Sequence, residues 1–122
     1  MKKKKLYMDK LYMGLYKANI TFLIGDVEKL DKYLKKEYGM EEKKYPRGGQ
    51  TTEFTHKNGS KGYILWLPKL DYAALAHEAT HLAGYIFEWR RVYTTSFGTD
   101  EHFAYMVEWI ARQYITFAKN KK

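Results

Sequence analysis

Hydrophobic runs and periods divide the first half of the chain into a strand, a helix and a connection. The apolar run at residues 20–24 is rich in strand-forming side chains and predicts a buried strand. Between residues 27 and 38 apolar positions recur every three or four residues, which predicts an amphipathic helix with Asp26 as its N-cap and Gly39 at its end. Residues 41–49 mix proline and glycine with charges, and they predict an exposed connection that carries no chemistry.

The second half of the chain predicts a hairpin followed by two helices. Residues 51–57 and 60–67 flank Asn58-Gly59, a pair that favours a two-residue turn. One helix is expected from its N-cap Asp71 to about Trp89, and a last helix from about residue 100 to residue 117. The apolar stripes of the two helices are Leu75, Leu82, Ile86 and Trp89 in the first, and Phe103, Val107, Ile110, Tyr114 and Phe117 in the second.

Together these elements predict an α+β fold, with a small antiparallel or mixed sheet of three to four strands packed on three helices. The helix at 71–89 is expected to be central. The length of 122 residues, with 45% hydrophobic and 17% aromatic residues, is that of a single domain, residues 1–122, with its own core. The strand at 63–67 is an edge strand or a core strand, and its apolar character favours the core.

The charge of the chain is concentrated at its two ends. The formal net charge is +8, from 22 basic and 14 acidic residues. Seven of the lysines lie in basic tails at residues 1–5 and 119–122, and without them the chain is close to neutral. A net charge of this sign suggests nucleic acid or an anionic membrane as a partner. Because the positive charge lies at the two ends of the chain, nucleic-acid binding through the lysine tails ranks third among the predicted functions.

The absence of cysteine limits the chemistry that is available. Disulfides, iron–sulfur clusters, thiolate zinc sites and cysteine nucleophiles are excluded, so a metal must be bound by His, Asp or Glu. After Leu6-Tyr7-Met8, the charged Asp9 and Lys10 interrupt any signal-peptide core, and no apolar run is long enough to span a membrane. We therefore expect a cytoplasmic protein with no membrane partner.

The strongest chemical signal is His77-Glu78-Ala79-Thr80-His81, an H-E-x-x-H sequence in the helix at 71–89. Two histidines four residues apart point from one side of a helix toward a single metal ion. Zinc with an open coordination position lowers the pKa of a bound water to about 7 and polarises a carbonyl. Glu78, rotated by about 100° from His77, is suited to take the proton of that water.

Two further observations bear on this motif. It has a simpler interpretation, as satisfied polar groups on a packed helix. The metzincin pattern H-E-x-x-H-x-x-G-x-x-H is matched as far as Gly84 but has Phe87 at its last position, and phenylalanine cannot bind a metal. Gly84 is then expected to be a packing glycine, where another element crosses closely.

A second short sequence, Asp100-Glu101-His102-Phe103-Ala104-Tyr105, begins the last predicted helix twenty positions after His81. With this sequence the chain resembles the gluzincin branch of zinc peptidases, in which a glutamate from a second helix completes the metal site. It is also similar to small phage- and prophage-encoded metallopeptidases, which pair H-E-A-x-H with a later D-E-x-x-A-Y. The resemblance covers about residues 71–115. It implies a minimal zincin-like domain with its metal site within about residues 71–117, zinc held by His77, His81 and Glu101, Glu78 as general base, and the host cytoplasm as location if phage-encoded.

Other residues are candidates for supporting roles. Tyr105 stands where many gluzincins have an aspartate that orients a ligand histidine, so Tyr105, Asp100 and His102 are candidates for positions beside the ligands. Glu108, two helical turns beyond Glu101, is the reserve third ligand. No motif identifies the group that stabilises the transition state, and the candidates are Tyr105, His102, Tyr93 and Arg112.

These observations predict a zinc-dependent metallopeptidase that hydrolyses a peptide or protein substrate with a metal-activated water and Glu78 as base. The alternative is a catalytically silent, zinc-stabilised protein-interaction module of phage type. Its motivation is that larger relatives build their cleft between two lobes, and this chain has only one. Zinc is the expected cofactor, although two histidines and a carboxylate accept several divalent ions.

Overall fold

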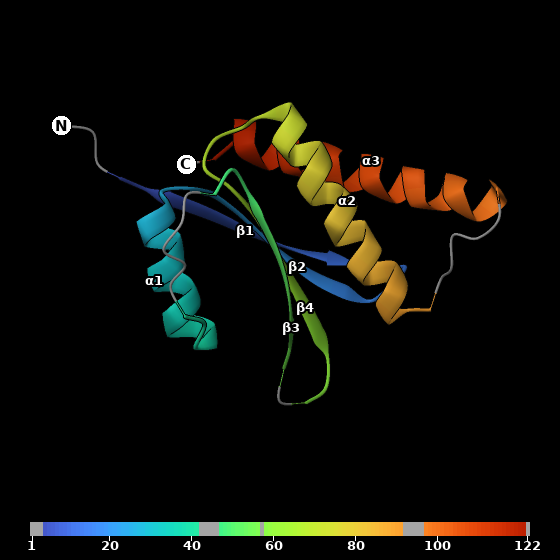
Figure 1. Cartoon of the computed structure of the whole chain (residues 1–122), viewed down its shortest axis with the longest axis horizontal. Coiled ribbons are helices and arrows are strands. Elements are labelled where there is room, and N and C mark those ends of the chain that lie inside the picture. Colours follow the sequence, from blue (N-terminus) through green and yellow to red (C-terminus); the bar gives the residue numbers. More distant parts are fainter. Residues whose placement is uncertain (1–3, 42–46, 57, 92–96, 122) are drawn as a thin grey trace.

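The computed structural model describes residues 4–41, 47–56, 58–91 and 97–121, with residues 97–100 described as backbone only. Its elements confirm the predicted α+β class, with a four-stranded mixed sheet and three helices (Figure 1). In chain order they are β1 (Leu6–Met13), β2 (Ala18–Gly25), α1 (Val27–Tyr38), β3 (Gln50–Thr55), β4 (Lys61–Leu67), α2 (Tyr72–Trp89) and α3 (Phe97–Lys119).

The sheet has the strand order β1-β2-β4-β3. β1 pairs with β2 and β3 with β4 in antiparallel fashion, whereas the two central strands β2 and β4 run parallel. Both central strands are almost continuously buried, as expected of strands that are covered on both faces. The apolar segment 63–67 is therefore a core strand, and the edge strand beside it is β3.

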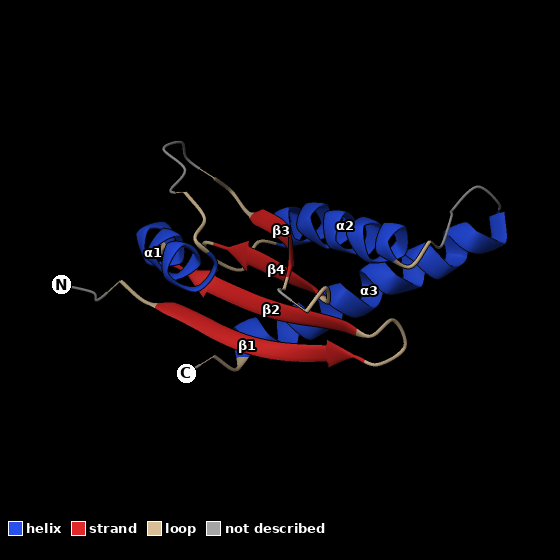
Figure 2. Cartoon of the chain, turned by 90° about the horizontal axis from the view of Figure 1, so that it is seen from below, coloured by secondary structure: helices blue, strands red, loops and turns tan. Residues whose placement is uncertain are grey.

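Helices cover the two faces of this sheet unequally (Figure 2). α2 and α3 pack on one face and form the larger core, which contains Phe22, Tyr63, Leu65, Leu82 and Ile110 among others. α1 packs on the opposite face over a smaller core of Leu23, Leu30, Leu34, Ile64 and Trp66. Because α2 contacts β3, β4 and α3, it has the central place that the sequence predicts.

The helix ends follow from local side-chain chemistry. The Asp26 carboxylate accepts a hydrogen bond from Lys29 N, and Gly39 ends α1 with a φ of 68°. The Asp71 carboxylate accepts from Ala73 N and Ala74 N at the start of α2. The sequence predictions for the start of both helices and for the end of α1 are confirmed.

Several local predictions are wrong. The strand ladder ends at the Thr55–Lys61 pair, so the hairpin connection is wider than two residues. The Asn58 side chain accepts hydrogen bonds from the amide and hydroxyl of Ser60, which favours this wider loop over a tight turn. A Cβ added to Gly84 would meet open space, so none of the described elements crosses closely there. Trp89 is 39% exposed because it lies at the last turn of α2, beyond the sheet.

The connection before β3 also departs from its prediction. Residues 42–46 are outside the described part, but the Arg47 side chain is only 4% exposed. Its guanidinium donates to Asp31 Oδ1 at 2.6 Å and to Gln50 Oε1 at 2.7 Å, and lies 5.6 Å from the Trp66 ring. Arg47 therefore ties the start of β3 to α1 and to the smaller core.

Over the described residues, none of the helices combines the length and the apolar character that a membrane crossing requires.

The buried Arg47–Asp31 pair predicts a large effect on stability. Asp31→Ala leaves the guanidinium buried without its charge partner, and we expect the free energy of unfolding to fall by about 3 kcal/mol. The matched control is Glu108→Ala, which removes the exposed Glu108–Arg112 pair and should cost at most about 0.5 kcal/mol. Urea unfolding measures the free energy of unfolding of both variants. If it falls by an equally small amount in the two, the contact of Arg47 with Asp31 does not stabilise the fold.

Tyr63 predicts a stabilising substitution. Its side chain is fully buried and its hydroxyl has no hydrogen-bond partner among the described residues, so Tyr63→Phe should raise the free energy of unfolding by about 1 kcal/mol. Burial, with a smaller contribution from Glu53, raises the pKa of Tyr63 to about 12. The folded state thus keeps a proton that an unfolded tyrosine loses above about pH 10, and stability falls as the pH rises from there. Urea unfolding near pH 7 and near pH 11 should show less of this loss in Tyr63→Phe than in the wild type.

Candidate metal centre

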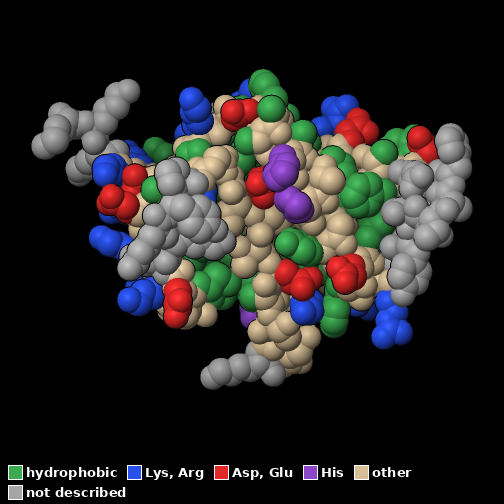
Figure 3. All heavy atoms as spheres, viewed as in Figure 1, with side chains coloured by type: hydrophobic (Ala, Val, Ile, Leu, Met, Phe, Trp, Pro, Cys, Tyr) green, Lys and Arg blue, Asp and Glu red, His purple; other side chains and the backbone are tan. Residues whose placement is uncertain are grey.

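The H-E-x-x-H sequence lies in the first half of α2 and brings its two histidines together. His77 Nε2 and His81 Nε2 are 3.1 Å apart, and the ring planes are inclined by 82°. Figure 3 shows histidine side chains gathered on the exposed surface over α2, beside an acidic side chain. The predicted convergence of this pair on one side of the helix is confirmed.

The outward direction of the pair follows from the periodicity of α2. Leu75, Leu82 and Ile86 face the sheet and are buried. His77 is two residues from Leu75, which is about 200° around the helix, so it points away from the core. Its side chain is 69% exposed. The pair is therefore accessible to an ion from solvent.

The spacing of the two nitrogens suits a metal ion. Two ligand nitrogens, each about 2.0–2.1 Å from a tetrahedral zinc, are about 3.3 Å apart. The observed 3.1 Å between the Nε2 atoms is close to that value and is also within the range of a hydrogen bond between the two rings. The Tyr85 ring lies on the next turn, nearly parallel to the His81 ring and with its centroid 6.5 Å away.

Glu78 sits beside the pair but belongs to the buried side of α2. The residue is 8% exposed, and Thr51 Oγ1 lies 2.7 Å from its Oε1 and 3.0 Å from its backbone oxygen. The other carboxylate oxygen, Oε2, is 4.0 Å from His77 Nε2. One oxygen is thus held by β3 while the other faces the histidines, as a base acting beside a metal would require.

Gly49 provides the space for this carboxylate. A Cβ at Gly49 would lie 2.9 Å from Glu78 Cγ and 3.2 Å from Oε2, closer than side chains normally pack. Neither Gly49 nor Thr51 is predicted as a site residue from the sequence, in which residues 41–49 are expected to carry no chemistry. No sequence signal connects them to Glu78, because their contact depends on the pairing of β3 with β4 beneath α2.

The predicted third ligand is not brought to the pair. Among the described residues, no group of three or more His, Asp or Glu side chains is placed to hold a metal ion. Glu101 is exposed on α3, and it is nine residues from the buried Ile110, or about 180° around the helix. Glu108 is on the same outward side and pairs with Arg112, with Nη2 2.9 Å from Oε1. A ligand role for Glu101 stays a prediction.

The other predicted supporting residues also lie away from the pair. His102 and Tyr105 line a groove of about 570 Å³ between α3 and the β1–β2 connection. Arg112 is engaged by Glu108. Tyr93 and the side chain of Asp100 lie outside the described residues. None of the described candidates therefore meets a carbonyl bound at the histidines without a change in structure.

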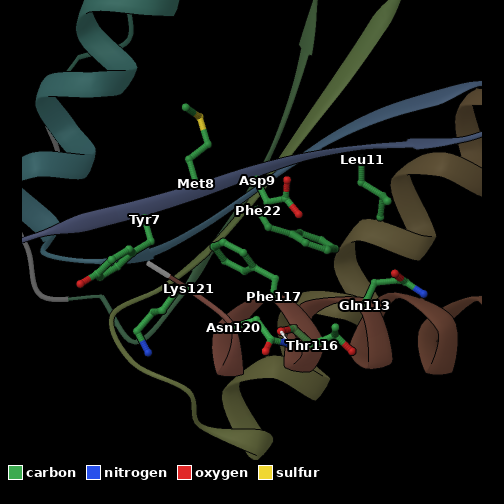
Figure 4. Close-up of a pocket in the computed structure, with 10 residues that line it drawn as sticks. All are labelled: Tyr7, Met8, Asp9, Leu11, Phe22, Gln113, Thr116, Phe117, Asn120 and Lys121. Atoms are coloured by element: carbon green, nitrogen blue, oxygen red, sulfur yellow. Dashed lines mark hydrogen bonds between the residues drawn. The ribbon is translucent and has the colours of Figure 1, made fainter.

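A separate pocket lies between β1 and the end of α3 (Figure 4). Its described lining residues offer no set of side chains like the histidine pair with Glu78. Its polar groups serve the helix end, because Asn120 Nδ2 donates to Thr116 O at 2.8 Å and Lys121 Nζ to Ala118 O at 3.1 Å. The histidine pair with Glu78 remains the site with the clearest chemistry.

Comparison with protein-family models, with curated proteins and with solved structures finds no match to this chain.

The geometry predicts which histidines bind a metal. His77→Ala and His81→Ala should each weaken zinc binding at least tenfold, the scale of loss found for residues that merely support a ligand. His56→Ala and His102→Ala are the matched controls, because both residues are exposed and distant from the pair along the chain. Glu101→Ala should have a smaller effect than either ligand substitution. Competition with a chromophoric chelator measures the affinities.

Two results would contradict these expectations. Equal affinity in His77→Ala and in His102→Ala would exclude the pair as the metal site. A loss in Glu101→Ala as large as in His81→Ala would mean that α3 rearranges on binding and supplies the third ligand after all.

Proposed function

We propose that the chain is a zinc-dependent peptidase whose centre is His77, His81 and Glu78. The observation that carries this proposal is the pair of Nε2 atoms 3.1 Å apart, next to a buried carboxylate with one oxygen directed toward them. The same separation also fits a direct hydrogen bond between the two imidazoles, with one ring as donor and the other as acceptor, and a bound ion would take the place of the shared proton. Nitrogen donors at this separation fit zinc and several other divalent ions.

The residues have distinct roles in this proposal. His77 and His81 hold the ion, which when bound supplies a Lewis acid and lowers the pKa of a water. Glu78 Oε2 takes a proton from the attacking water and delivers it to the leaving amine. Thr51 holds Oε1, so that the carboxylate cannot rotate away from the histidines. Gly49 leaves room for Oε2.

A peptide substrate is supported by the position of β3. This strand is at the edge of the described sheet, and its Thr51 touches the base. An extended peptide can add to such an edge through main-chain hydrogen bonds. The scissile bond of a strand bound there would pass near Glu78.

The second candidate is a zinc-stabilised interaction module without catalysis. Two observations favour it: the outward exposure of His77, and the absence of a third ligand beside the pair among the described residues. In that case chelation would destabilise the fold and no peptide would be hydrolysed.

Glu78→Gln tests the catalytic proposal. The substitution keeps the shape and the hydrogen bond from Thr51 but removes the base, so hydrolysis of a broad peptide library should fall by about 100-fold or more. Zinc content should be unchanged. Glu88→Gln, an exposed residue of the same helix, is the matched control and should keep full activity.

Gly49→Ala tests the geometry around that base. The added methyl displaces the Glu78 carboxylate, and we expect lower kcat with zinc affinity retained. Activity that survives Glu78→Gln would exclude the mechanism. A zinc-loaded wild type that cleaves no library peptide would favour the interaction module.

A further inference from the structure

The sheet face under α1 is only partly covered. The smaller core fills the space between α1 and the sheet around Leu23, Ile64 and Trp66. Figure 2 shows α1 over one end of this face, and no other described helix lies on that side of the strands. The open part of this face lies toward the β1–β2 connection and the β3–β4 hairpin. Tyr12, near the end of β1, and Lys61, at the start of β4, mark these two ends of the strands.

One row of residues in register crosses this open part. Tyr12 pairs with Asn19, Asn19 with Gly62, and Gly62 with Phe54, so the row runs through all four strands. Directly paired residues point to the same side of a sheet, here the side of α1. The two central positions are short and the two outer positions are aromatic. The row therefore forms a trough with Asn19 in its floor.

Aromatic rings build one wall of this trough firmly. The Phe54 ring lies directly over Gly62, where an added Cβ would be 2.2 Å from Cζ. Tyr38 packs on Phe54 at a centroid distance of 4.3 Å, and His56 at 4.9 Å. Tyr12 forms the opposite wall and is 58% exposed. The hollow has a volume of about 340 Å³ and is also lined by Lys10 and Thr21.

The charges around the trough favour an anionic ligand. Lys10 lies two residues from Tyr12 on the same side of β1, and its ammonium is exposed. No carboxylate is among the described residues that line the hollow. The nearest acidic residues along the strands, Asp9 and Glu53, are each one residue from a lining side chain and so point to the other face. Glu53 is moreover paired with Lys61 at 3.5 Å.

We propose that this trough binds single-stranded nucleic acid. A base can stack on the exposed Tyr12 ring, the Asn19 amide offers both a donor and an acceptor to a base edge, and Lys10 can neutralise a phosphate. Stacking requires unpaired bases, so a duplex should bind more weakly than a single strand. This site uses the sheet face rather than the lysine tails, and it shares no residue with the histidine pair.

Fluorescence anisotropy with labelled oligouridine and oligothymidine of about eight nucleotides tests the proposal. We expect Tyr12→Ala to weaken binding about tenfold and Tyr12→Phe to retain it, because phenylalanine keeps the stacking ring. Lys10→Ala should weaken binding and reduce its salt dependence. Tyr72→Ala and Lys69→Ala are matched controls, since both residues are exposed but lie near the start of α2, and they should bind like the wild type.

Other outcomes would overturn this proposal. The proposal fails if the wild type binds no oligonucleotide. It also fails if Tyr12→Ala and Lys10→Ala bind the oligonucleotide as tightly as the wild type does. Loss of binding on alanine substitution of Lys2, Lys3 and Lys122, with Tyr12→Ala at wild-type affinity, would assign binding to the tails. If uridine monophosphate binds as tightly as the oligonucleotide, the ligand of the trough is a free nucleotide and not a nucleic-acid strand. Circular dichroism checks that each variant is folded.

Discussion

Burial of β4 on both of its faces is the constraint on which the rest of the structure depends. Tyr63, Leu65 and Leu67 face α2 and α3, while Ile64 and Trp66 face α1. A strand that is apolar on both sides must lie inside the sheet, so β2 and β3 flank it and helices cover both faces. Because α2 follows β4 after a short connection, the packing of α2 against this strand decides which of its side chains face the solvent.

The chemistry of α2 lies at the boundary that this packing creates. Leu75, Leu82 and Ile86 occupy the middle of the buried stripe, and the histidines lie on the far side. Glu78 falls between the two, at the margin of the stripe, where β3 can reach its carboxylate through Thr51. In the proposed site, a single helix presents two histidines to solvent and keeps the Glu78 carboxylate buried because the stripe ends at that residue. Arg47 contributes indirectly, since it anchors the chain just before Gly49.

The sequence predicts local features well and non-local ones poorly. α1 and the start of α2 are predicted closely, because capping aspartates and apolar periods act within a few residues. The sequence does not predict β1, because Asp9 and Lys10 interrupt its apolar residues and its pairing with β2 is a tertiary feature. The contact of Thr51 with Glu78 spans 27 positions and needs the strand order to be known. The resemblance suggested Glu101 as a ligand, but the apolar stripe predicted for the last helix already places Glu101 opposite Ile110.

The two proposed sites lie on opposite sides of the sheet and are physically independent. The histidine pair is on α2, and the trough is on the face that α1 leaves open. Substitutions at sites that are far apart in space and share no partners usually contribute additively, so a substitution at Tyr12 should leave Glu78 undisturbed. β3 nevertheless serves both faces: Thr51 touches the base, whereas Phe54 builds the trough wall. Alternation along this one edge strand therefore places residues of the two proposed sites on opposite faces of the sheet.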